Sequence, residues 1–458
     1  MRLDALMRPQ SIAIVGASEK PTIGRRLIAS LDRLGYAGRI YPINPNYPSV
    51  LGHQCYGSFA ELPEAPDAAA FCLGHARVLE SFLAAAERGI GAAVIYDGGF
   101  AELDEEGRAL QARIAAICRE REIALCGPNC MGILSPHHKS LTYMQELHAA
   151  EGLAGNVGIV SQSGGICIGF AMDVRRFGFS HLVSCGNEAV VTAAEFLEYL
   201  ALDPNTRVIG GFIETVREPE RFAAALDRAA AAGKPVVILQ VGKTARSRQA
   251  ALAHTGGPMR EPQALSALFA AHGAIEVSDL VAFGEVSAAA QSEKRPRGRR
   301  IGVVTSSGGL AELILDATAA AGIELPPLPE AARAALAAKI GPVTGDGNPL
   351  DAWGSGTFAQ NLPHAFEVFD KSLEHDAIVF CRDNCDGQPF DTPETARGYL
   401  DLLISAAGRS EKPHYLLHPH PGVMDRSLVA HLRAHGIAVL CGIREGLGAI
   451  VRLARISE

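Results

Sequence analysis

The sequence has little that would serve a nucleic acid, a membrane or secretion. Its 458 residues include one Trp and only 6% aromatic residues, and their formal net charge is −8. No Lys/Arg cluster is interleaved with aromatic residues, as a nucleic-acid surface would need, and no run of about 18 apolar residues marks a membrane helix. The first residues, MRLDALMRPQSIAIVGAS, lack the continuous apolar core of a signal peptide. We therefore expect a cytoplasmic protein without nucleic-acid or membrane partners.

Cysteine is present, but without the spacing of a disulfide framework or a zinc site. The ten cysteines are scattered through apolar surroundings, which favours reduced thiols in the cytosol. Two short segments, CGPNC (126–130) and CRDNC (381–385), each hold two cysteines four positions apart. Neither has the second cysteine pair or the histidines of a zinc site. The sequence therefore predicts no metal site.

The chain is too long for one hydrophobic core, and its pattern divides it into three α/β regions. Short β-branched apolar runs alternate with longer Ala- and Leu-rich segments of helical period, which is typical of parallel sheets with crossover helices. The strands of the first region are expected within 11–18, 38–47, 68–74, 91–99 and 122–132. About five strand–helix repeats predict a Rossmann-like doubly wound domain over residues 1–145.

Two further regions begin with similar sequences, VGIVSQSGGICIGFAMDVRRFG and IGVVTSSGGLAELILDATAAAG. Each is an apolar strand, a Ser/Gly-rich turn and an Ala-rich helix, so we interpret residues 150–290 and 300–458 as related α/β domains. Further strands are expected at HLVSCGNEA, 208–216, 235–242, 376–381, 413–418 and 437–442. The basic stretch EKRPRGRR (293–300) is interpreted as a solvated linker between these regions.

The turn VGASEKPTIGRR (15–26) follows the first expected strand and opens a helix, which places backbone N–H groups where a phosphate could dock. Gly16 and Gly24 are too far apart for a dinucleotide fingerprint, and the next turn, PINPN, carries Asn44 and Asn46 where an NAD site has an acidic residue. An ordinary strand–turn–helix connection explains the residues equally well. If the turn does bind a ligand, the pattern favours a nucleotide-containing molecule other than NAD.

Two other turns, SQSGG (161–165) and SSGGL (306–310), combine hydroxyls, glycines and a helix N-terminus. This combination suits a small anion such as phosphate or a carboxylate. A tight turn capped by serine is the alternative for both. The pattern favours anion binding for the first turn and leaves the second undecided.

A titratable ring stands in an unusual setting at RQAALAHTGGPM, where His254 is followed by Thr255 and two glycines. A neutral imidazole that is held by an acceptor is a competent nucleophile. Glu214 ends an expected strand in FIETV and could orient such a ring. A core histidine and a strand-end glutamate remain the alternative from the residues alone.

Eight motifs, in order, are similar to those of one family. They are SIAIVGASEKPTIGRR, YPINPN, GPNCMGI, GIVSQSGG, CGNEA…EFLEYLALDPNTRVIGGFIE, KPVVILQVGKT…AALAHTGG, IGVVTSSGGLAELILDA and NPLDAWG. With them the chain resembles, over essentially its whole length, the NDP-forming acyl-CoA synthetases, specifically the α subunit of the ADP-forming acetate–CoA ligases, which is related to that of succinyl-CoA synthetase.

The resemblance implies a Rossmann-like CoA-binding domain followed by two flavodoxin-like domains of the succinyl-CoA ligase type. It also implies that a carboxylic acid is joined to coenzyme A through an acyl phosphate, with the phosphoryl group carried by a histidine on a swinging loop. That histidine would exchange with ATP or ADP, together with Mg²⁺, on a separate ATP-grasp domain. The glycines after the histidine would allow the loop to move.

The resemblance also assigns residues. The phosphohistidine would be His254, with Glu214 as its supporting carboxylate. The phosphate would be held by Ser161, Gln162, Ser163 and Gly164. Coenzyme A would be bound by Gly16, Ala17, Ser18, Lys20, Asn44, Pro45, Gly127, Pro128 and Asn129.

The sequence departs from the family pattern in places. We find no ATP-grasp domain, so we expect an ATP-grasp β subunit as partner in a hetero-oligomer. Ala253 stands where the family usually has serine, Gln240 and Val241 where Lys or Arg is usual before GKT, and Glu195 where Asp is usual. These changes leave the acid unidentified. The alternatives are a CoA- or acyl-CoA-binding module without complete ligase activity and, on the first domain alone, an NAD(P)-dependent oxidoreductase.

Overall fold

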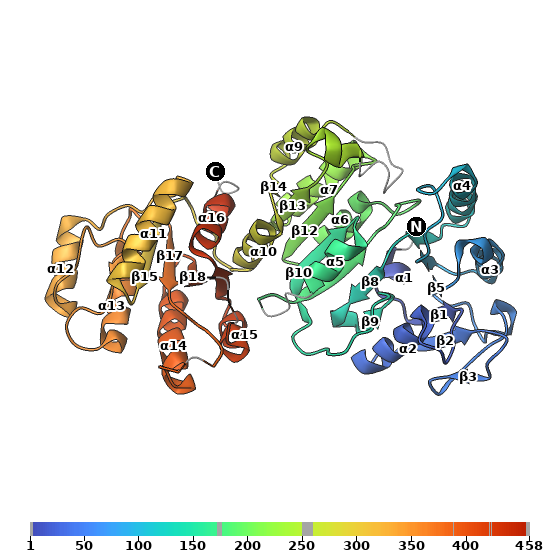
Figure 1. The fold of residues 1–458 in the computed structure, drawn as a ribbon, viewed down its shortest axis with the longest axis horizontal. Coiled ribbons are helices and arrows are strands. Elements are labelled where there is room, and N and C mark those ends of the chain that lie inside the picture. Colours follow the sequence, from blue (N-terminus) through green and yellow to red (C-terminus); the bar gives the residue numbers. More distant parts are fainter. Residues whose placement is uncertain are drawn as a thin grey trace. The chain divides into compact units, whose positions relative to one another are not determined.

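The computed structural model describes residues 3–171, 176–249, 260–387, 389–420, 422 and 424–454. The chain forms two compact units, one of Met1–Val174 with Gly178–Glu276 and one of Arg175–Phe177 with Val277–Glu458. Three sheets, two parallel and one mostly parallel, each with helices on its faces, make up the α/β architecture predicted from the sequence (Figure 1). None of the helices in the described part of the chain combines the length and apolarity needed to cross a bilayer.

The first sheet has five parallel strands, all in the first unit. In spatial order they are β2 (Arg39–Ile43), β1 (Ser11–Val15), β5 (Ala68–Phe71), β6 (Ala92–Ile95) and β7 (Ala124–Cys126). The helices of this region are α1 (Leu3–Met7), α2 (Ile23–Leu34), α3 (His75–Arg88) and α4 (Glu105–Glu120). A small hairpin, β3 (Ser49–Val50) and β4 (His53–Gln54), follows β2. Strands β1, β5, β6 and β7 are buried along their whole length, as expected when helices cover both faces.

Local sequence sets the ends of these helices. Helix α4 starts where the Asp104 carboxylate accepts a hydrogen bond from the Gly107 N–H at 2.8 Å. Helix α2 ends at Gly35, whose φ of 69° is left-handed. The amphipathic faces of the helices then pack on the sheet around buried aromatic residues such as Phe71 and Phe82.

The second sheet has seven strands. In spatial order they are β9 (Ser140–Leu141), β8 (Gly132–Ser135), β11 (Phe179–Ser184), β10 (Ala154–Ser161), β12 (Val208–Ile213), β13 (Val236–Gln240) and β14 (Ile275–Val277). Its helices are α5 (Gly164–Ala171), α6 (Ala193–Leu202), α7 (Pro219–Ala231) and α9 (Pro262–Ala271). β10 to β13 pair in parallel, whereas β8 joins β11 and β9 antiparallel.

The third sheet, in the second unit, has five parallel strands. In spatial order they are β16 (Leu350–Asp351), β15 (Ile301–Thr305), β17 (Ala377–Cys381), β18 (His414–His418) and β19 (Ala438–Cys441). Its helices are α10 (Leu280–Ala289), α11 (Gly308–Ala321), α12 (Glu330–Ile340), α13 (Phe358–Lys371), α14 (Pro393–Arg409), α15 (Arg426–Ala434) and α16 (Ile443–Ala454). The predicted domain boundaries, 1–145, 150–290 and 300–458, stay a prediction.

All three sheets share one strand order. Numbered along the chain, the five principal strands of each sheet lie in the order 2-1-3-4-5. In such open sheets, ligands bind beyond the carboxyl ends of the strands where the order reverses, between the first and third strands. This switch point lies between β1 and β5, between β10 and β12, and between β15 and β17.

The basic stretch 293–300 is not a solvated linker. Within the second unit, the Lys294 ammonium donates to the backbone oxygen of Ala407 at 2.6 Å and also to that of Ser410. The Arg300 guanidinium makes two hydrogen bonds of 3.0 Å to the carboxylate of Asp376. These contacts bind the stretch to the end of α14 and to the residue before β17, although its charge and proline content had predicted a solvated segment.

Candidate functional site

At the switch point of the second sheet, the two predicted halves of a phosphate site lie side by side. β10 ends at Ser161, which pairs in register with Phe212 of β12. Glu214 follows two residues later, and α5 begins at Gly164, directly after the serine-containing turn. The fold therefore brings Glu214 and the turn Ser161–Gly164 to the edge of the sheet where ligands of α/β proteins bind.

Gln162 links the two halves. Its buried side-chain oxygen accepts hydrogen bonds from the backbone N–H groups of Glu214 at 2.6 Å and Thr215 at 3.0 Å. Its amide nitrogen donates to the Thr215 carbonyl at 2.9 Å. The backbone that carries the buried Glu214 is thus fixed against the predicted phosphate turn.

The serines of the turn shape its backbone. The Ser161 hydroxyl donates to the Ser163 carbonyl at 2.7 Å and accepts from the Ser163 N–H at 3.2 Å. The Ser163 hydroxyl accepts from the Ile166 N–H at 3.4 Å, inside the first turn of α5. A Cβ atom added to Gly165 would meet nothing within 4 Å. The turn is therefore open at Gly165, and it leads into the start of a helix, where backbone N–H groups can bind an anion.

A buried carboxylate, Glu188, belongs to the same edge and was not predicted. It lies in the CGNEA turn after β11 with a φ of 53°, and one oxygen accepts from the Ala193 N–H at 2.7 Å. The other oxygen accepts from Arg217 Nε at 3.2 Å. Burial raises the pKa of Glu188, against the hydrogen bond from Gln162 and the charge of Arg217, which both lower it. Only the position of Glu188 in a Gly/Asn turn after a strand could have signalled it in the sequence.

Asn187 connects this edge to the first sheet. Its amide nitrogen donates to Glu102 and, at 3.0 Å, to Gln111, and its side-chain oxygen accepts from the Asn129 amide at 3.3 Å. Glu102 in turn accepts from the Gly99 N–H at 2.7 Å. Burial opposes ionisation of Glu102, but the hydrogen bonds from Asn187 and from the backbone outweigh it and hold its pKa below the usual range.

The turn predicted to bind coenzyme A lies at the switch point of the first sheet. Gly16 has a φ of 83°, and a Cβ there would lie 2.7 Å from the Cys72 carbonyl oxygen. The Asn44 amide donates to the Ala17 carbonyl at 2.7 Å, so the turns after β1 and β2 are joined. The hydroxyl of Ser18 lies 3.1 Å from that of Thr22, the residue before α2.

The remaining predicted coenzyme A residues lie at different depths. Lys20 and Pro45 are exposed on these two turns. The turn Gly127–Asn129 follows β7, so β5 and β6, about 14 Å of sheet, separate it from β1. Its backbone is bonded instead to the CGNEA turn, where the Asn187 N–H donates to the Pro128 carbonyl at 2.9 Å and the Ala189 N–H to that of Gly127 at 3.1 Å.

The predicted phosphohistidine, His254, lies outside the described residues, and so do Ala253 and the glycines after it. The described chain on the far side of this segment returns to the second-sheet edge. Arg260 Nε donates to the Val216 carbonyl at 3.2 Å, two residues beyond Glu214. Arg248 and Glu261, one from each side of the segment, form an ion pair of 3.4 Å.

Comparison with known proteins identifies two domains. Residues 10–136 match the family described as the CoA binding domain, and residues 154–290 match the succinyl-CoA ligase like flavodoxin domain. A trans-feruloyl-CoA synthase from an unknown prokaryotic organism is 34% identical over 76% of this chain and 50% of its own length. The α subunit of an ADP-forming acetate–CoA ligase II from Pyrococcus furiosus is 29% identical over 76% of each chain.

Among solved structures, the chain is similar to the dinucleotide-forming acetyl-coenzyme A synthetase 1 of Ca. Korarchaeum cryptofilum in complex with phosphate and ADP. The two are 26% identical, with a TM-score of 0.86 over 99% of this chain and 97% of that one. The chain spans about half the length of several curated relatives that it matches, including an ADP-forming acetate–CoA ligase II of Archaeoglobus fulgidus.

Proposed function

We propose that this chain, which is related by sequence and fold to the NDP-forming acyl-CoA synthetases, is the CoA-binding and phosphohistidine-carrying part of an acid–CoA ligase. The observation that carries the proposal is the edge of the second sheet. There Gln162 holds the turn Ser161–Gly164 and the backbone of Glu214 together. The segment with His254 leaves and rejoins the described chain next to this edge.

Chain length allows His254 to reach this edge. Six peptide units separate His254 from Arg260, and such a segment spans at most about 20 Å. Arg260 is bonded to Val216, next to the Glu214 turn. The acceptor that an imidazole needs in order to hold one ring nitrogen protonated is then available in the Glu214 carboxylate.

The proposed chemistry moves one phosphoryl group through two transfers. In the direction of acid release, inorganic phosphate attacks the thioester carbon of an acyl-CoA, and free coenzyme A leaves with the formation of an acyl phosphate. A neutral ring nitrogen of His254 then attacks the phosphorus, and the carboxylate of the acid leaves. Glu214 would stabilise the positive charge that develops on the ring. The turn Ser161–Gly164 would bind the phosphoryl oxygens.

Coenzyme A would be bound by the first sheet. The N–H groups at the start of α2 and the joined turns at Gly16–Lys20 and Asn44–Pro45 are suited to its phosphates. Gly16 lets this turn pack closely on the residues after β5, because a Cβ there would lie 2.7 Å from the Cys72 carbonyl oxygen.

Nucleotide exchange would take place on a partner. We propose an ATP-grasp β subunit that binds ATP or ADP with Mg²⁺ and meets phosphorylated His254. Relatives named α subunits, such as that of the Pyrococcus furiosus ligase, support a two-chain enzyme. We further propose that the complex works in the cytoplasm.

The proposal is tested by labelling His254. Separate samples of the purified chain are incubated with ³²P-phosphate and one acyl donor each. The donors are acetyl-CoA, 4-hydroxybutyryl-CoA and feruloyl-CoA. We expect one of them to give an acid-labile, alkali-stable label that peptide mass spectrometry places on His254. The same experiment identifies the acid.

Two variants serve as controls. His254→Ala is expected to abolish the label while leaving CoA binding unchanged in a thermal-shift titration, since the first sheet binds CoA. A label that survives in His254→Ala would exclude His254 as the carrier. A chain that binds CoA, but is labelled neither with these acyl donors and phosphate nor with a β subunit and ATP, would favour a CoA-binding module instead.

A further inference from the structure

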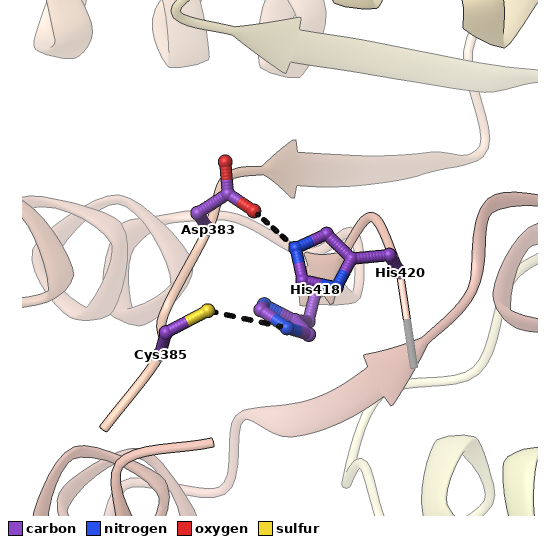
Figure 2. Close-up of side chains that lie close together, drawn as sticks. All are labelled: Asp383, Cys385, His418 and His420. Atoms are coloured by element: carbon purple, nitrogen blue, oxygen red, sulfur yellow. Dashed lines mark hydrogen bonds and ion pairs between the residues drawn. The ribbon is translucent and has the colours of Figure 1, made fainter. Parts of the chain in front are cut away.

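Four side chains that commonly bind metals converge at the carboxyl edge of the third sheet (Figure 2). Asp383 and Cys385 follow β17, His418 is the last residue of β18, and His420 lies two residues beyond it. One donor atom from each of the four lies within 4.8 Å of those of the other three. The histidines that CRDNC lacks in the sequence are thus supplied by the neighbouring strand.

The distances within this cluster are close to those of a zinc site. His420 Nε2 lies 3.1 Å from Asp383 Oδ1, and Cys385 Sγ lies 3.8 Å from His418 Nε2. A tetrahedral zinc ion holds nitrogen, oxygen and sulfur ligands about 3.4–3.8 Å apart. Small side-chain movements would therefore bring three donors to one ion.

Hydrogen bonding divides the roles of the two histidines. His418 is buried, and its Nδ1 accepts the Asn384 N–H at 3.1 Å. The neutral ring must then carry its proton on Nε2, which faces Cys385 Sγ. His418 is thus a hydrogen-bond donor to the sulfur rather than a ligand, and such donors around metal-bound groups tune the site. This leaves Cys385, His420 and Asp383 as ligands.

Backbone contacts hold the two segments of the cluster together. The Arg382 N–H donates to the Leu417 carbonyl at 3.0 Å, and the Asp425 N–H donates to the Asn384 carbonyl at 2.9 Å. Gly422 leaves space for both rings, because a Cβ there would lie 3.3 Å from His420 Nδ1 and 3.4 Å from His418 Nε2. The backbone that carries the four donors is therefore fixed by the fold.

The cluster occupies the place in the third sheet that the candidate phosphate site occupies in the second. Ser161 pairs with Phe212, and Thr305 pairs with Cys381. Glu214 lies two residues after Phe212 and Asp383 lies two residues after Cys381, so the two carboxylates are at equivalent positions. In the neighbouring strands, Phe212 pairs with Leu239 of β13 and Cys381 pairs with Leu417 of β18. The residues that follow, Gln240 and His418, are therefore also equivalent. Ligands of α/β sheets gather at this edge.

We propose that Cys385, His420 and Asp383 bind one Zn²⁺ ion, with His418 donating a hydrogen bond to the Cys385 sulfur. On binding, the Cys385 thiol releases its proton to solvent, and the ion replaces any proton shared by His420 and Asp383. The protein supplies three ligands, so the fourth position takes water or another small ligand, as in zinc sites that keep an open position. A thiolate with imidazole and carboxylate selects zinc over Mg²⁺ or Ca²⁺.

The test uses the full chain, freed of metal with a chelator under reducing conditions. Zn²⁺ is titrated against a chromophoric chelator, and we expect one tightly bound equivalent. Co²⁺ is then added as a spectroscopic probe. Thiolate-to-cobalt charge transfer in the near ultraviolet is expected, together with the d–d intensity of a tetrahedral ion. Mg²⁺ in excess should displace neither metal.

Matched variants separate this site from the other thiols and rings. Cys385→Ser and His420→Ala are expected to weaken zinc binding at least about 100-fold, and Cys385→Ser should also remove the charge-transfer band. His418→Asn keeps an acceptor for the Asn384 N–H but loses the donor to sulfur, and should weaken binding about 10- to 100-fold while keeping the band. Cys118→Ser, on α4 in the first unit, and His364→Ala, on α13 in the second, should change the affinity less than about two-fold.

A chain that binds no zinc, or a zinc affinity equally unaffected by Cys385→Ser and Cys118→Ser, would overturn the proposal. Thermal unfolding in chelator checks that each variant is folded, and His420→Ala alters an exposed side chain, so it keeps the test decisive if His418→Asn unfolds. Labelling of His254 is measured on the same metal-free preparations and is expected to be unchanged. A chain that binds no zinc can therefore still support the proposed ligase function, and a chain without the His254 label can still bind zinc.

Discussion

At the switch point of the second sheet, Gln162 is buried. Its side-chain amide accepts from the Glu214 N–H and donates to the Thr215 carbonyl, both in the turn after β12. At the same point of the third sheet, Ser306 is only half-buried, and the residue after β17 is Arg382, whose guanidinium lies 4.3 Å over the ring of Tyr399. The serine that follows, Ser163 or Ser307, accepts a hydrogen bond from the first turn of the next helix in both sheets. Ser163 accepts from the Ile166 N–H at 3.4 Å, and Ser307 from the Leu310 N–H at 3.3 Å.

The comparison separates what the two similar sequences share from what they do not. The Ser-Gly-Gly part of each turn starts a helix, and that role needs no ligand. The residue before it, Gln162 or Ser306, decides whether the first and third strands are linked at their ends. The shared motif therefore stands beside a carboxylate, Glu214, at the predicted phosphate turn of one sheet, and beside a cluster of sulfur, imidazole and carboxylate donors in the other.

The largest expected effect concerns the two carboxylates at the same register position. Glu214→Gln should slow phosphorylation of His254 by at least about 100-fold, because the amide cannot stabilise a positive ring. Asp383→Asn should leave that rate unchanged. The initial rate of ³²P incorporation measures both. Equal rates in Glu214→Gln and wild type would remove Glu214 from the mechanism.

The second largest effect is a pH dependence of stability that is expected from His414, the first residue of β18. The residue at the corresponding register position of the second sheet is Val236, the first residue of β13. Burial lowers the pKa of His414 to about 4, against the hydrogen bond to the Lys412 carbonyl, which raises it. The unfolded chain, with an ordinary histidine pKa of about 6.5, binds the proton first as the pH falls. The second unit should therefore lose up to about 3 kcal/mol of stability between pH 6.5 and 4.

Replacing this ring tests the assignment. In His414→Phe the part of the pH dependence that belongs to His414 should disappear, whereas Val236→Ala in the second sheet should lower stability equally at all pH values. Denaturant unfolding of the full chain at pH 7 and pH 4.5 provides the measurement. A pH dependence identical in His414→Phe and wild type would show that other groups cause it.

A smaller effect is expected at the residue that distinguishes the two turns. Gln162→Ala removes the buried acceptor of two N–H groups and the donor to Thr215, and should destabilise the first unit by about 2 kcal/mol. Ser306→Ala should change the stability of the second unit by less than about 0.5 kcal/mol. Urea midpoints of the two variants test this ordering, and the reverse order would contradict the role given to Gln162.

The smallest expected effect is at the glycine that opens each helix. A Cβ on Gly164 would lie 2.7 Å from Met131 Cγ, so Gly164→Ala should cost about 1 kcal/mol while Met131 moves aside. A Cβ on Gly308 would meet only the Asp351 carboxylate at the end of β16, at 3.7 Å. Gly308→Ala should therefore be neutral within about 0.5 kcal/mol. Thermal unfolding measures both.

The sequence predicted the principal strands well, because each is a short apolar run between segments of helical period. The expected strands at 68–74, 208–216 and 376–381 are β5, β12 and β17. It did not predict β8 and β9, which pair antiparallel at the edge of the second sheet. These strands of two to four residues carry too few side chains to show a period.

The candidate site was less accessible to sequence reasoning. Glu188 is buried only because the CGNEA turn has a positive φ and Arg217, far along the chain, meets it. The zinc cluster depends on β17 and β18 lying next to each other, so Cys385 and His418 have no diagnostic spacing. The role of His254 stays a prediction.

Asn187 has a consequence for how the first unit would respond to occupancy. Its side-chain amide donates to Glu102, in the loop between β6 and α4, and its backbone oxygen accepts from Arg217, the partner of Glu188, at 2.8 Å. A molecule that displaces the Glu102 loop must also disturb the neighbour of Arg217. By thermodynamic reciprocity, if that molecule shifts the proton affinity of Glu188, then protonation of Glu188 shifts the affinity for the molecule by the same factor.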